Sequence, residues 1–449
     1  MRRTVIMWFR RDLRLADLPA LHAAAADGAR VVPLFVVDPV FATSGVPRRA
    51  FMARALSALD DAIATALVYR HGAPGDVVPR LAAEVGADQV FVSRDYAPYG
   101  RRRDASVAAA LRSIDVEFAG VGSPYAVQPG SVTKADGSPY AVFTPFSRMW
   151  RAHGWDAPLG VPEVDWFGAP DVHCDGPPSI PECAVELPHW TEDDAHERWL
   201  EFLPQAGSYA DRRDLPSQDG TSRLSAALRW GLVHPRQLLA ELGPERGHEV
   251  FASELAWREF YADVLFRRPE SAWSNLDPKM ASMVVDTDAA ARARFDRWAT
   301  GTTGFPIVDA GMRQLLATGW MHNRVRMLVA SFLVKDLHLP WQWGARHFMA
   351  HLVDADLASN QHGWQWAAGT GTDAAPYFRV FNPTTQAHRF DADGEYVRRW
   401  VPELSGIAGG AVHEPGSRRP GEYPAQMVDH GAEREEALAR YRHAVAGSR

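Results

Sequence analysis

Cysteine is nearly absent from this chain, because only Cys174 and Cys183 occur among its 449 residues. Both lie in a proline-rich stretch, and neither has a partner at the spacing of a zinc site. We therefore expect no metal site, no disulfide framework and a location in the reducing cytoplasm.

Long hydrophobic runs and a net positive charge are also lacking. No apolar stretch approaches the roughly 20 residues of a membrane-spanning helix, and the basic N-terminus is followed by charge instead of a cleavage site. The net charge of −7 neither supports nor excludes a nucleic-acid partner, since arginines gathered on one face can still bind DNA. We expect a soluble protein with no membrane partner.

The usual catalytic signatures are missing too. The sequence holds no P-loop, no triad of nucleophile, base and orienting acid, and no set of metal ligands. The first apolar run is followed by FRRDLRLADLPAL, which is not a glycine-rich dinucleotide fingerprint. Hydrolysis and phosphoryl transfer are therefore disfavoured, and redox chemistry on a bound cofactor remains.

Two regions of different periodicity are present. Short apolar runs alternate with alanine-rich helical stretches up to residue 125, which predicts a Rossmann-like α/β domain with a parallel sheet. A proline- and glycine-rich connector follows over residues 126–195, and helical patterns dominate a larger all-α domain over residues 196–449. The expected strands are residues 5–9, 31–37, 66–69, 90–93 and 116–120, and the clearest expected helices of the larger domain are 224–230, 249–266, 307–318 and 322–337.

Residues 354–383 combine indoles, amides and acids in the run DADLASNQHGWQWAAGTGTDAAPYFRVFNP. On a helix, Trp364 and Trp366 point to nearly opposite sides, so one indole can enter the core while the other lines a surface pocket. This mixture suits a flat redox cofactor better than a plain core.

Three further motifs lie on expected helices. In GTSRLS (220–225), hydroxyls and backbone N–H groups could hold a phosphate, and the alternative is an ordinary N-cap. In SELAWREFY (253–261), an acid, an indole and a guanidinium share one face, and the alternative is a solvated Glu–Arg pair beside a core tryptophan. In WMHNRVRM (320–327), one arginine could meet phosphate while the other pairs with Asp354 or Asp356, and the alternative is a charged outer stripe.

These motifs, in this order, resemble the photolyase/cryptochrome family, and most closely the class I cyclobutane pyrimidine dimer photolyases of bacteria. MWFRRDLRLADLPAL, GTSRLS, ELAWREFY, GFPIVDAGMRQLLATGWMHNRVRM and NQHGWQWAAGTGTDAAPYFRVFNP carry the resemblance, which covers nearly the whole chain. It implies light-driven repair of dimers in DNA by electron transfer from excited reduced FAD to a flipped-out lesion.

The resemblance implies that the helical domain binds FAD. A neutral amide at Asn360 would lie beside flavin N5 without adding negative charge next to a reduced flavin. The implied FAD-binding residues are Tyr209, Thr221, Ser222, Arg223, Leu224, Ser225, Arg258, Asn323, Arg326, Asp354, Asp356 and Asn360.

A lesion pocket and a DNA-binding surface are also implied, in a protein that needs no obligate protein partner and acts as a monomer. Indoles would stack on the linked pyrimidines, and Glu254 would hydrogen-bond to them. The implied lesion residues are Glu254, Trp257, Asn323, Met327 and Trp366, with Asn360 as the flavin contact, and the implied phosphate contacts are Arg213, Arg258, Arg324 and Arg379.

The chain departs from its relatives in two places. Trp364 and Trp341 match the inner two of the three tryptophans that photoreduce FAD, but the third is missing near Asp286, and we expect Trp298 to replace it. The cysteine–lysine pair of folate-binding relatives is also missing. We therefore expect 8-hydroxy-5-deazaflavin as the second, antenna chromophore, near Phe35, Asp38, Arg49 and Arg101; the alternative is an empty cleft.

Three alternatives remain open. A cryptochrome-like light receptor would keep FAD but signal to a protein, although only 45 residues follow Leu404. A (6-4) photolyase is disfavoured because its adjacent histidine pair is absent from MHNR at 321–324. A non-enzymatic flavin- or DNA-binding protein would show no effect of light on damaged DNA.

Overall fold

The computed structural model describes residues 2–187, 191–376 and 379–446. By their backbone contacts the residues form two compact units. The first comprises Met1–Cys183, Pro188–Ala206 and Ser222–Pro269, and the second comprises Ala184–Leu187, Gly207–Thr221 and Glu270–Arg449. These units do not follow the boundaries expected at residues 125 and 195, so that functional division stays a prediction.

The first unit is built on a parallel sheet with the strand order β3-β2-β1-β4-β5, and β6 pairs with β2. All six residues of the central β1 are buried, as expected for a parallel strand covered on both faces. The five expected strands are confirmed with shifts of at most two residues. The strands are β1 (Thr4–Phe9), β2 (Arg30–Val37), β3 (Val68–His71), β4 (Gln89–Val92), β5 (Glu117–Gly120) and β6 (Asp165–Trp166).

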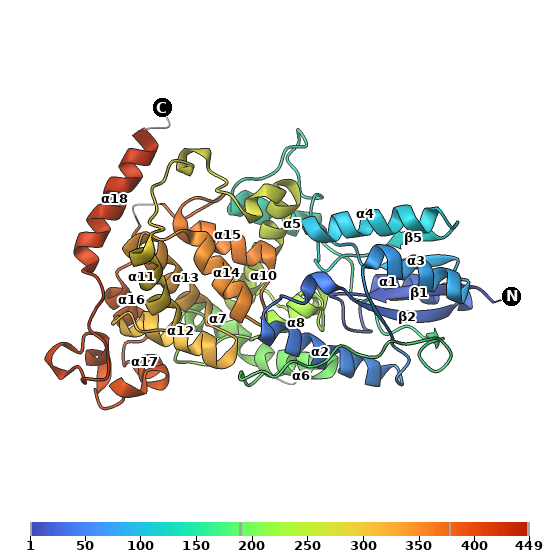
Figure 1. Ribbon diagram of the computed structural model, residues 1–449, viewed down its shortest axis with the longest axis horizontal. Helices are drawn as coiled ribbons and strands as arrows, with labels where there is room; N and C mark the ends of the chain where they lie inside the picture. The colour runs from blue at the N-terminus through green and yellow to red at the C-terminus, as the bar shows by residue number, and fades with distance from the viewer. Residues whose placement is uncertain (1, 188–190, 377–378, 447–449) are drawn as a thin grey trace. The chain divides into compact units, whose positions relative to one another are not determined.

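Some helices of the first unit pack around the sheet, and others follow later in the chain. α3 and α4 pack side by side, and Figure 1 shows α2 on the opposite side of the strands from α4. The helices of this unit are α1 (Pro19–Ala25), α2 (Val46–Ala62), α3 (Pro74–Val85), α4 (Pro98–Arg112), α5 (Phe143–His153), α6 (Glu192–Phe202), α8 (Ser225–Trp230), α9 (Pro235–Ala240) and α10 (Arg246–Arg267).

The connector is more ordered than its composition predicts. It contains α5 and β6, neither of which was expected. α5 forms because Phe146 and Trp150, four residues apart, bury one face of the helix while its other residues stay largely exposed. Proline-rich sequence on both sides of this short segment hid its periodicity.

The second unit is helical and encloses a large core of apolar side chains, among them Trp298, Phe332 and Trp364. Its helices are α7 (Tyr209–Arg212), α11 (Ala289–Ala299), α12 (Pro306–Thr318), α13 (Asn323–Ser331), α14 (Trp341–His351), α15 (Leu357–Ala368), α16 (Pro383–Phe390), α17 (Glu395–Trp400) and α18 (His430–Ala446).

Helix ends follow the expected signals where glycine is present. Gly319 ends α12 and Gly231 ends α8, both with positive φ, a conformation that only glycine adopts without strain. The helix expected over residues 322–337 is interrupted. The α-helical part, α13, ends at Ser331, and a π-helical turn, η6 (Phe332–Asp336), follows it directly. In this turn the buried Asp336 contacts His430 of α18 at 2.5 Å.

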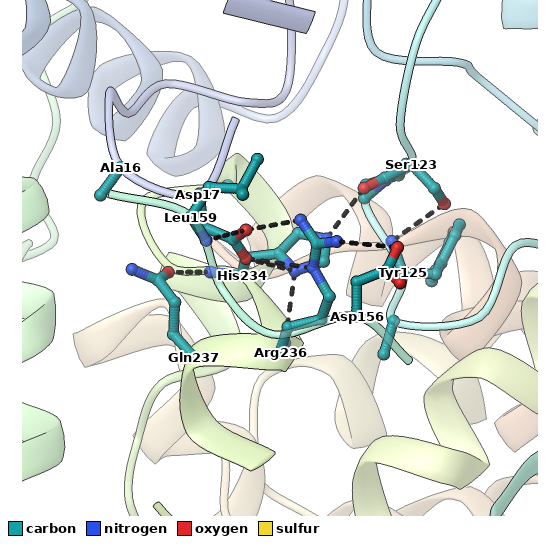
Figure 2. A network of polar contacts seen from close by, with 12 residues as sticks. Ala16, Asp17, Ser123, Tyr125, Asp156, Leu159, His234, Arg236 and Gln237 are labelled. Atoms are coloured by element: carbon teal, nitrogen blue, oxygen red, sulfur yellow. Dashed lines mark hydrogen bonds and ion pairs between the residues drawn. The ribbon is translucent and has the colours of Figure 1, made fainter. Parts of the chain in front are cut away.

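A buried polar network joins distant segments of the first unit (Figure 2). Arg236 donates to the carboxylate of Asp17 at 2.5 and 3.2 Å, and Leu159 donates its N–H to the same group at 3.0 Å. His234 contacts Asp17 and, through Nε2, the carbonyl oxygen of Ser123 at 2.9 Å. Burial lowers the pKa of His234 to about 4, so this ring is neutral at pH 7.

Candidate functional site

In the first unit, α10 presents three of the expected site residues on one face. Glu254, Trp257 and Arg258 are each partly buried on this helix. Arg258 donates to the carbonyl oxygens of Pro124 at 3.1 Å and Leu228 at 3.2 Å. The guanidinium therefore ties α10 to the segment just before the connector and to α8, which differs from the solvated Glu–Arg pair considered above.

The GTSRLS loop passes from one unit to the other, because Thr221 belongs to the second and Ser222 to the first. α8 has Leu224 as its N-cap with no capping side chain, so the ordinary-cap interpretation is wrong. Arg223 has a φ of 57°, a conformation that is uncommon for a side-chain-bearing residue and is often found at functional sites. The hydroxyl of Ser225 is buried and has no protein hydrogen-bond partner among the described residues, which suits a polar ligand there.

In the second unit, the expected pairing of one arginine with an acid is present. Arg326 on α13 contacts Asp354 through both terminal nitrogens, at 2.8 and 3.3 Å, and donates its Nε to the carbonyl oxygen of Met321 at 2.8 Å. The Asp354 carboxylate is almost completely buried, with 3% of its side chain exposed. A bidentate pair of this kind holds both side chains in one geometry.

Helix α15 carries the amide that the resemblance places beside the flavin. Asp356 caps this helix by accepting the N–H of Ser359 at 3.1 Å. The Nδ2 of Asn360 donates to Ala345 O at 3.1 Å and to Gln361 Oε1 at 2.8 Å, and neither bond uses the side-chain oxygen of Asn360. This oxygen is an acceptor, which fits the N–H at N5 of a reduced flavin.

The two indoles of α15 differ in burial. Trp364 is 2% exposed, whereas Trp366 is only partly buried against the same core. A Cβ on Gly344 of α14 would overlap the Trp364 ring, so glycine allows α14 to approach this indole closely. The Nε1 of Trp364 is buried and has no hydrogen-bond partner among the described residues, so this indole has no protein group to take its proton.

The aromatic side chains around Trp364 form a continuous series. Trp298 lies 6.0 Å from Trp364 between ring centroids, and Phe295 lies 5.6 Å from both Trp298 and Trp343. Trp298 is fully buried and donates Nε1 to Val329 O, so it is not itself a surface terminus. The outermost ring of the series is the partly buried Trp343.

Trp341 and Asp286, at the other two expected relay positions, both make polar contacts. Trp341 is 4% exposed and donates its Nε1 to Asn275 Oδ1 at 2.8 Å. Asp286, where a third indole was missing, accepts from Arg294 and Arg440 at 2.7 Å each. Ion pairs therefore occupy that position.

The remaining expected site residues lie on helices and loops of the second unit. Asn323 and Met327 stand one turn apart on α13, which packs against α15. Arg324 pairs with Asp214 at 2.8 Å and lies over the Phe390 ring. Arg213 also lies near Asp214, at 3.9 Å, so this acid, which sequence reasoning missed, orders two of the four proposed phosphate contacts.

Arg379 and Tyr209 complete the set. Arg379 lies over the Phe381 ring, with 5.7 Å between guanidinium carbon and ring centroid, and its carbonyl oxygen accepts from Lys335. Tyr209 is buried under the guanidinium of Arg213. Tyr377 and Phe378 of the 354–383 motif lie outside the described residues.

Of the four expected antenna residues, Arg101 differs from the other three in its contacts. Asp38 accepts a hydrogen bond from the hydroxyl of Tyr99, and Phe35 is 6% exposed in the sheet. The Nε of Arg49 on α2 is buried without a hydrogen-bond partner among the described residues. Arg101 instead donates to Phe266 O at 3.1 Å and covers that ring, so its contacts are with the end of α10.

Within residues 2–187, 191–376 and 379–446, no helix combines the length and the apolar character that a membrane span requires. The same residues contain no group of three or more histidine, cysteine, aspartate or glutamate side chains arranged to hold a metal ion.

Comparisons with known proteins identify the family of this chain. Residues 5–163 match the family described as DNA photolyase, and residues 251–443 match the family described as the FAD binding domain of DNA photolyase. The deoxyribodipyrimidine photo-lyase of Escherichia coli (strain K12) is 40% identical, and the match covers 99% of each chain.

Two solved structures have the same fold over almost their whole length. A class III photolyase from Agrobacterium tumefaciens has a TM-score of 0.89 at 35% identity, covering 99% of this chain and 98% of that one. A cryptochrome from Synechocystis sp. PCC6803 also has a TM-score of 0.89, at 25% identity, covering 98% and 99% of the two chains. With family matches over both units and 40% identity from end to end, this chain belongs to the DNA photolyase family.

Proposed function

We propose that this protein repairs cyclobutane pyrimidine dimers in DNA with blue light. The observation that carries the proposal is the arrangement of α15. This one helix buries Trp364 in the core, leaves Trp366 partly exposed two residues away, and carries Asn360 one turn before Trp364, with an amide oxygen that takes part in no hydrogen bond among the described residues. Packing alone accounts for the buried Trp364, but it requires neither the second, partly exposed indole nor the available amide oxygen.

Some of the residues that would hold FAD offer polar groups suited to a cofactor. Ser225 would donate its hydroxyl, which has no partner among the described residues, and Asp354 would hold the guanidinium of Arg326 in a fixed orientation. Asn360 would accept from the flavin ring without placing a negative charge beside it. FAD, when bound and reduced, supplies the electron that light transfers to the dimer, so the protein needs no acid or base for this step.

The lesion would be held by side chains of opposite character. Trp257 and Trp366 offer apolar ring faces to the linked pyrimidines, and Glu254 and Asn323 offer hydrogen bonds to their polar edges. Met327 would fill the irregular gap beside the rings. A dimer pairs poorly in duplex DNA, which lowers the cost of flipping it out.

The phosphate contacts would come from Arg213, Arg258, Arg324 and Arg379. Because Asp214 neutralises part of the charge of Arg324 and lies close to Arg213, we expect Arg379 to dominate the salt dependence of DNA binding in the second unit. No obligate partner protein is needed, and we propose that the chain acts as a monomer, which sedimentation at micromolar concentration would test.

A second chromophore would bind in the N-terminal α/β domain, and we propose 8-hydroxy-5-deazaflavin. The unpartnered Nε of Arg49 and the apolar face of Phe35 suit an anionic aromatic ring system. Adding the chromophore to purified protein should give sensitised repair at its absorption band, and Arg49→Ala should remove this gain. If folate gives the same gain and the deazaflavin gives none, this assignment is wrong.

The decisive experiment uses oligothymidine irradiated with ultraviolet light. The purified protein, loaded with FAD and reduced, is mixed with this substrate, illuminated with blue light, and the recovery of thymine absorbance is followed. Recovery should require light and should occur with cyclobutane dimers but not with (6-4) products. Photoreduction of FAD without any recovery would instead support a light receptor.

A further inference from the structure

Helix α5 of the connector lies along α10 and faces it with three aromatic or hydrogen-bonding side chains. Phe143, Phe146 and Trp150 are spaced so that all three fall on one side of the helix. Phe146 packs on Phe260 with ring centroids 5.1 Å apart, and Trp150 donates its Nε1 to Glu259 at 2.6 Å. These contacts place Phe143, the first residue of α5, next to Trp257 and Phe260 of α10.

Polar bonds hold α5 in this position. Glu259 is buried and also accepts the N–H groups of Ala126 at 2.6 Å and Val127 at 2.9 Å, so the start of the connector is bound to the same residue of α10 as Trp150. Next to Trp150, Arg151 donates to Ser253 Oγ at 2.7 Å and to Glu249 O at 3.1 Å. These bonds leave little freedom for α5 to slide along α10.

The result is a close stack between Phe143 and Trp257. The two ring centroids are 3.7 Å apart and the planes differ by 8°, so nothing fits between them. Phe260 meets the edge of the indole at 5.7 Å and Tyr261 lies 5.3 Å away. One face of Trp257 is therefore fully occupied, and the ring cannot turn without displacing Phe143.

We propose that Phe143 is a positioning residue for the lesion pocket. It acts through Trp257, holding the indole in one plane and leaving a single face for a pyrimidine of the flipped dimer. This inference rests on the proposed repair function, which assigns Trp257 to the pocket.

The chemistry of the lesion explains why such support is useful. The rings of a cyclobutane dimer have lost their 5,6 double bonds, so they are puckered and gain less from stacking than an intact base does. Binding then depends more on a surface that is already in place, because an indole ordered before binding loses no rotamer freedom when the lesion arrives.

A simple packing role is the competing interpretation, and it makes different predictions. Phe143 is partly exposed and begins its helix, so its removal leaves the deeper contacts of Phe146 and Trp150 in place. If Phe143 only stabilised the fold, its loss would lower the melting temperature and weaken damaged and undamaged DNA alike. A positioning residue changes binding of the dimer selectively.

The test measures dark binding of the FAD-loaded protein to an oligonucleotide with one dimer and to the same oligonucleotide without it. Phe143→Ala should weaken binding of the damaged strand about 3- to 10-fold, the scale of one aromatic pair, and leave the undamaged strand unchanged. Phe143→Tyr keeps the ring and should bind like the unmodified protein. Met149→Ala, on the exposed side of the same helix, is the matched control.

Two further measurements separate the interpretations. When the repair rate is measured over a range of substrate concentrations, Phe143→Ala should raise KM and leave kcat unchanged. In a Trp257→Ala background, Phe143→Ala should cause no additional loss, because it acts only through the indole. Equal losses for damaged and undamaged DNA, or an additive loss in that background, would overturn the proposal. If the unmodified protein itself does not distinguish the two strands, the repair function fails instead.

Discussion

Arg326 and Asp354 form a bidentate ion pair within the second unit, with the aspartate carboxylate almost fully buried and 24% of the arginine side chain exposed. The pair joins α13 to the segment that leads into α15. Both helices carry residues assigned to the cofactor, so this contact fixes their relative position.

Arg326→Ala should therefore destabilise the protein and reduce its FAD content. Removing the guanidinium leaves the Asp354 carboxylate buried without a counter-charge, at a cost of about 2 to 4 kcal/mol. Thermal melting and the ratio of flavin to protein absorbance after gel filtration measure the two effects. Arg434→Ala, which breaks an exposed pair with Glu435, should change the stability by less than about 0.5 kcal/mol. Equal behaviour of the two variants would show that the buried pair has no special role.

Gly344→Ala should disturb Trp364, because the added methyl group would overlap its ring. Overpacking of this kind costs about 1 to 3 kcal/mol, and we expect flavin photoreduction to slow as the indole is displaced. Gly363→Ala on α15 is the matched control. It meets no atom within 4 Å and should stabilise the helix by about 0.5 to 1 kcal/mol. A stabilised Gly344→Ala variant would contradict the close packing described above.

Trp298→Phe should slow the photoreduction of oxidised FAD in the presence of an external electron donor. The reason is that Trp298 is the ring that connects Trp364 to Phe295 and the partly exposed Trp343. Repair that starts from chemically reduced FAD should be unchanged, which controls for folding. Unaltered photoreduction would exclude this route and leave Trp341 as the remaining expected relay residue.

Acid should destabilise the protein below pH 6.5, and His347 should contribute to this effect. Burial lowers the pKa of His347 to about 3 in the folded protein, and its buried Nε2 has no hydrogen-bond partner among the described residues. Between pH 6.5 and 3 the unfolded chain binds a proton that the folded chain does not, so stability falls as the pH falls. At pH 5 this single residue should cost about 2 kcal/mol relative to pH 7.5.

His347→Leu should remove that part of the acid sensitivity. Urea unfolding at pH 7.5 and pH 5 gives the difference directly, and the variant should lose less stability between the two values than the unmodified protein does. The same substitution at the exposed His196 of α6 is the control. Identical pH dependence for both variants would show that His347 is protonated at little cost.

Local sequence patterns predicted the elements better than they predicted the contacts. The sheet, the ends of α8 and α12, and the different burial of Trp364 and Trp366 follow from apolar runs, glycine signals and helical spacing. The pairing of Arg326 with an acid was also expected. The partner Asp214 and the stack of Phe143 on Trp257 were not, because each joins residues more than 100 positions apart in the chain. The helix α5 was missed for a different reason, because proline-rich sequence on both sides hid its periodicity.

The sequence by itself determined which backbone segments form strands and helices, and which residue types are available for redox and stacking chemistry, because periodicity, capping and composition act over a few residues. Only the tertiary structure decided which partner each of these side chains meets. Asp214 beside Arg324 and Phe143 against one face of Trp257 are results of chain folding over long separations. No local pattern encodes such contacts, since they arise when elements pack to exclude water and pair their buried charges.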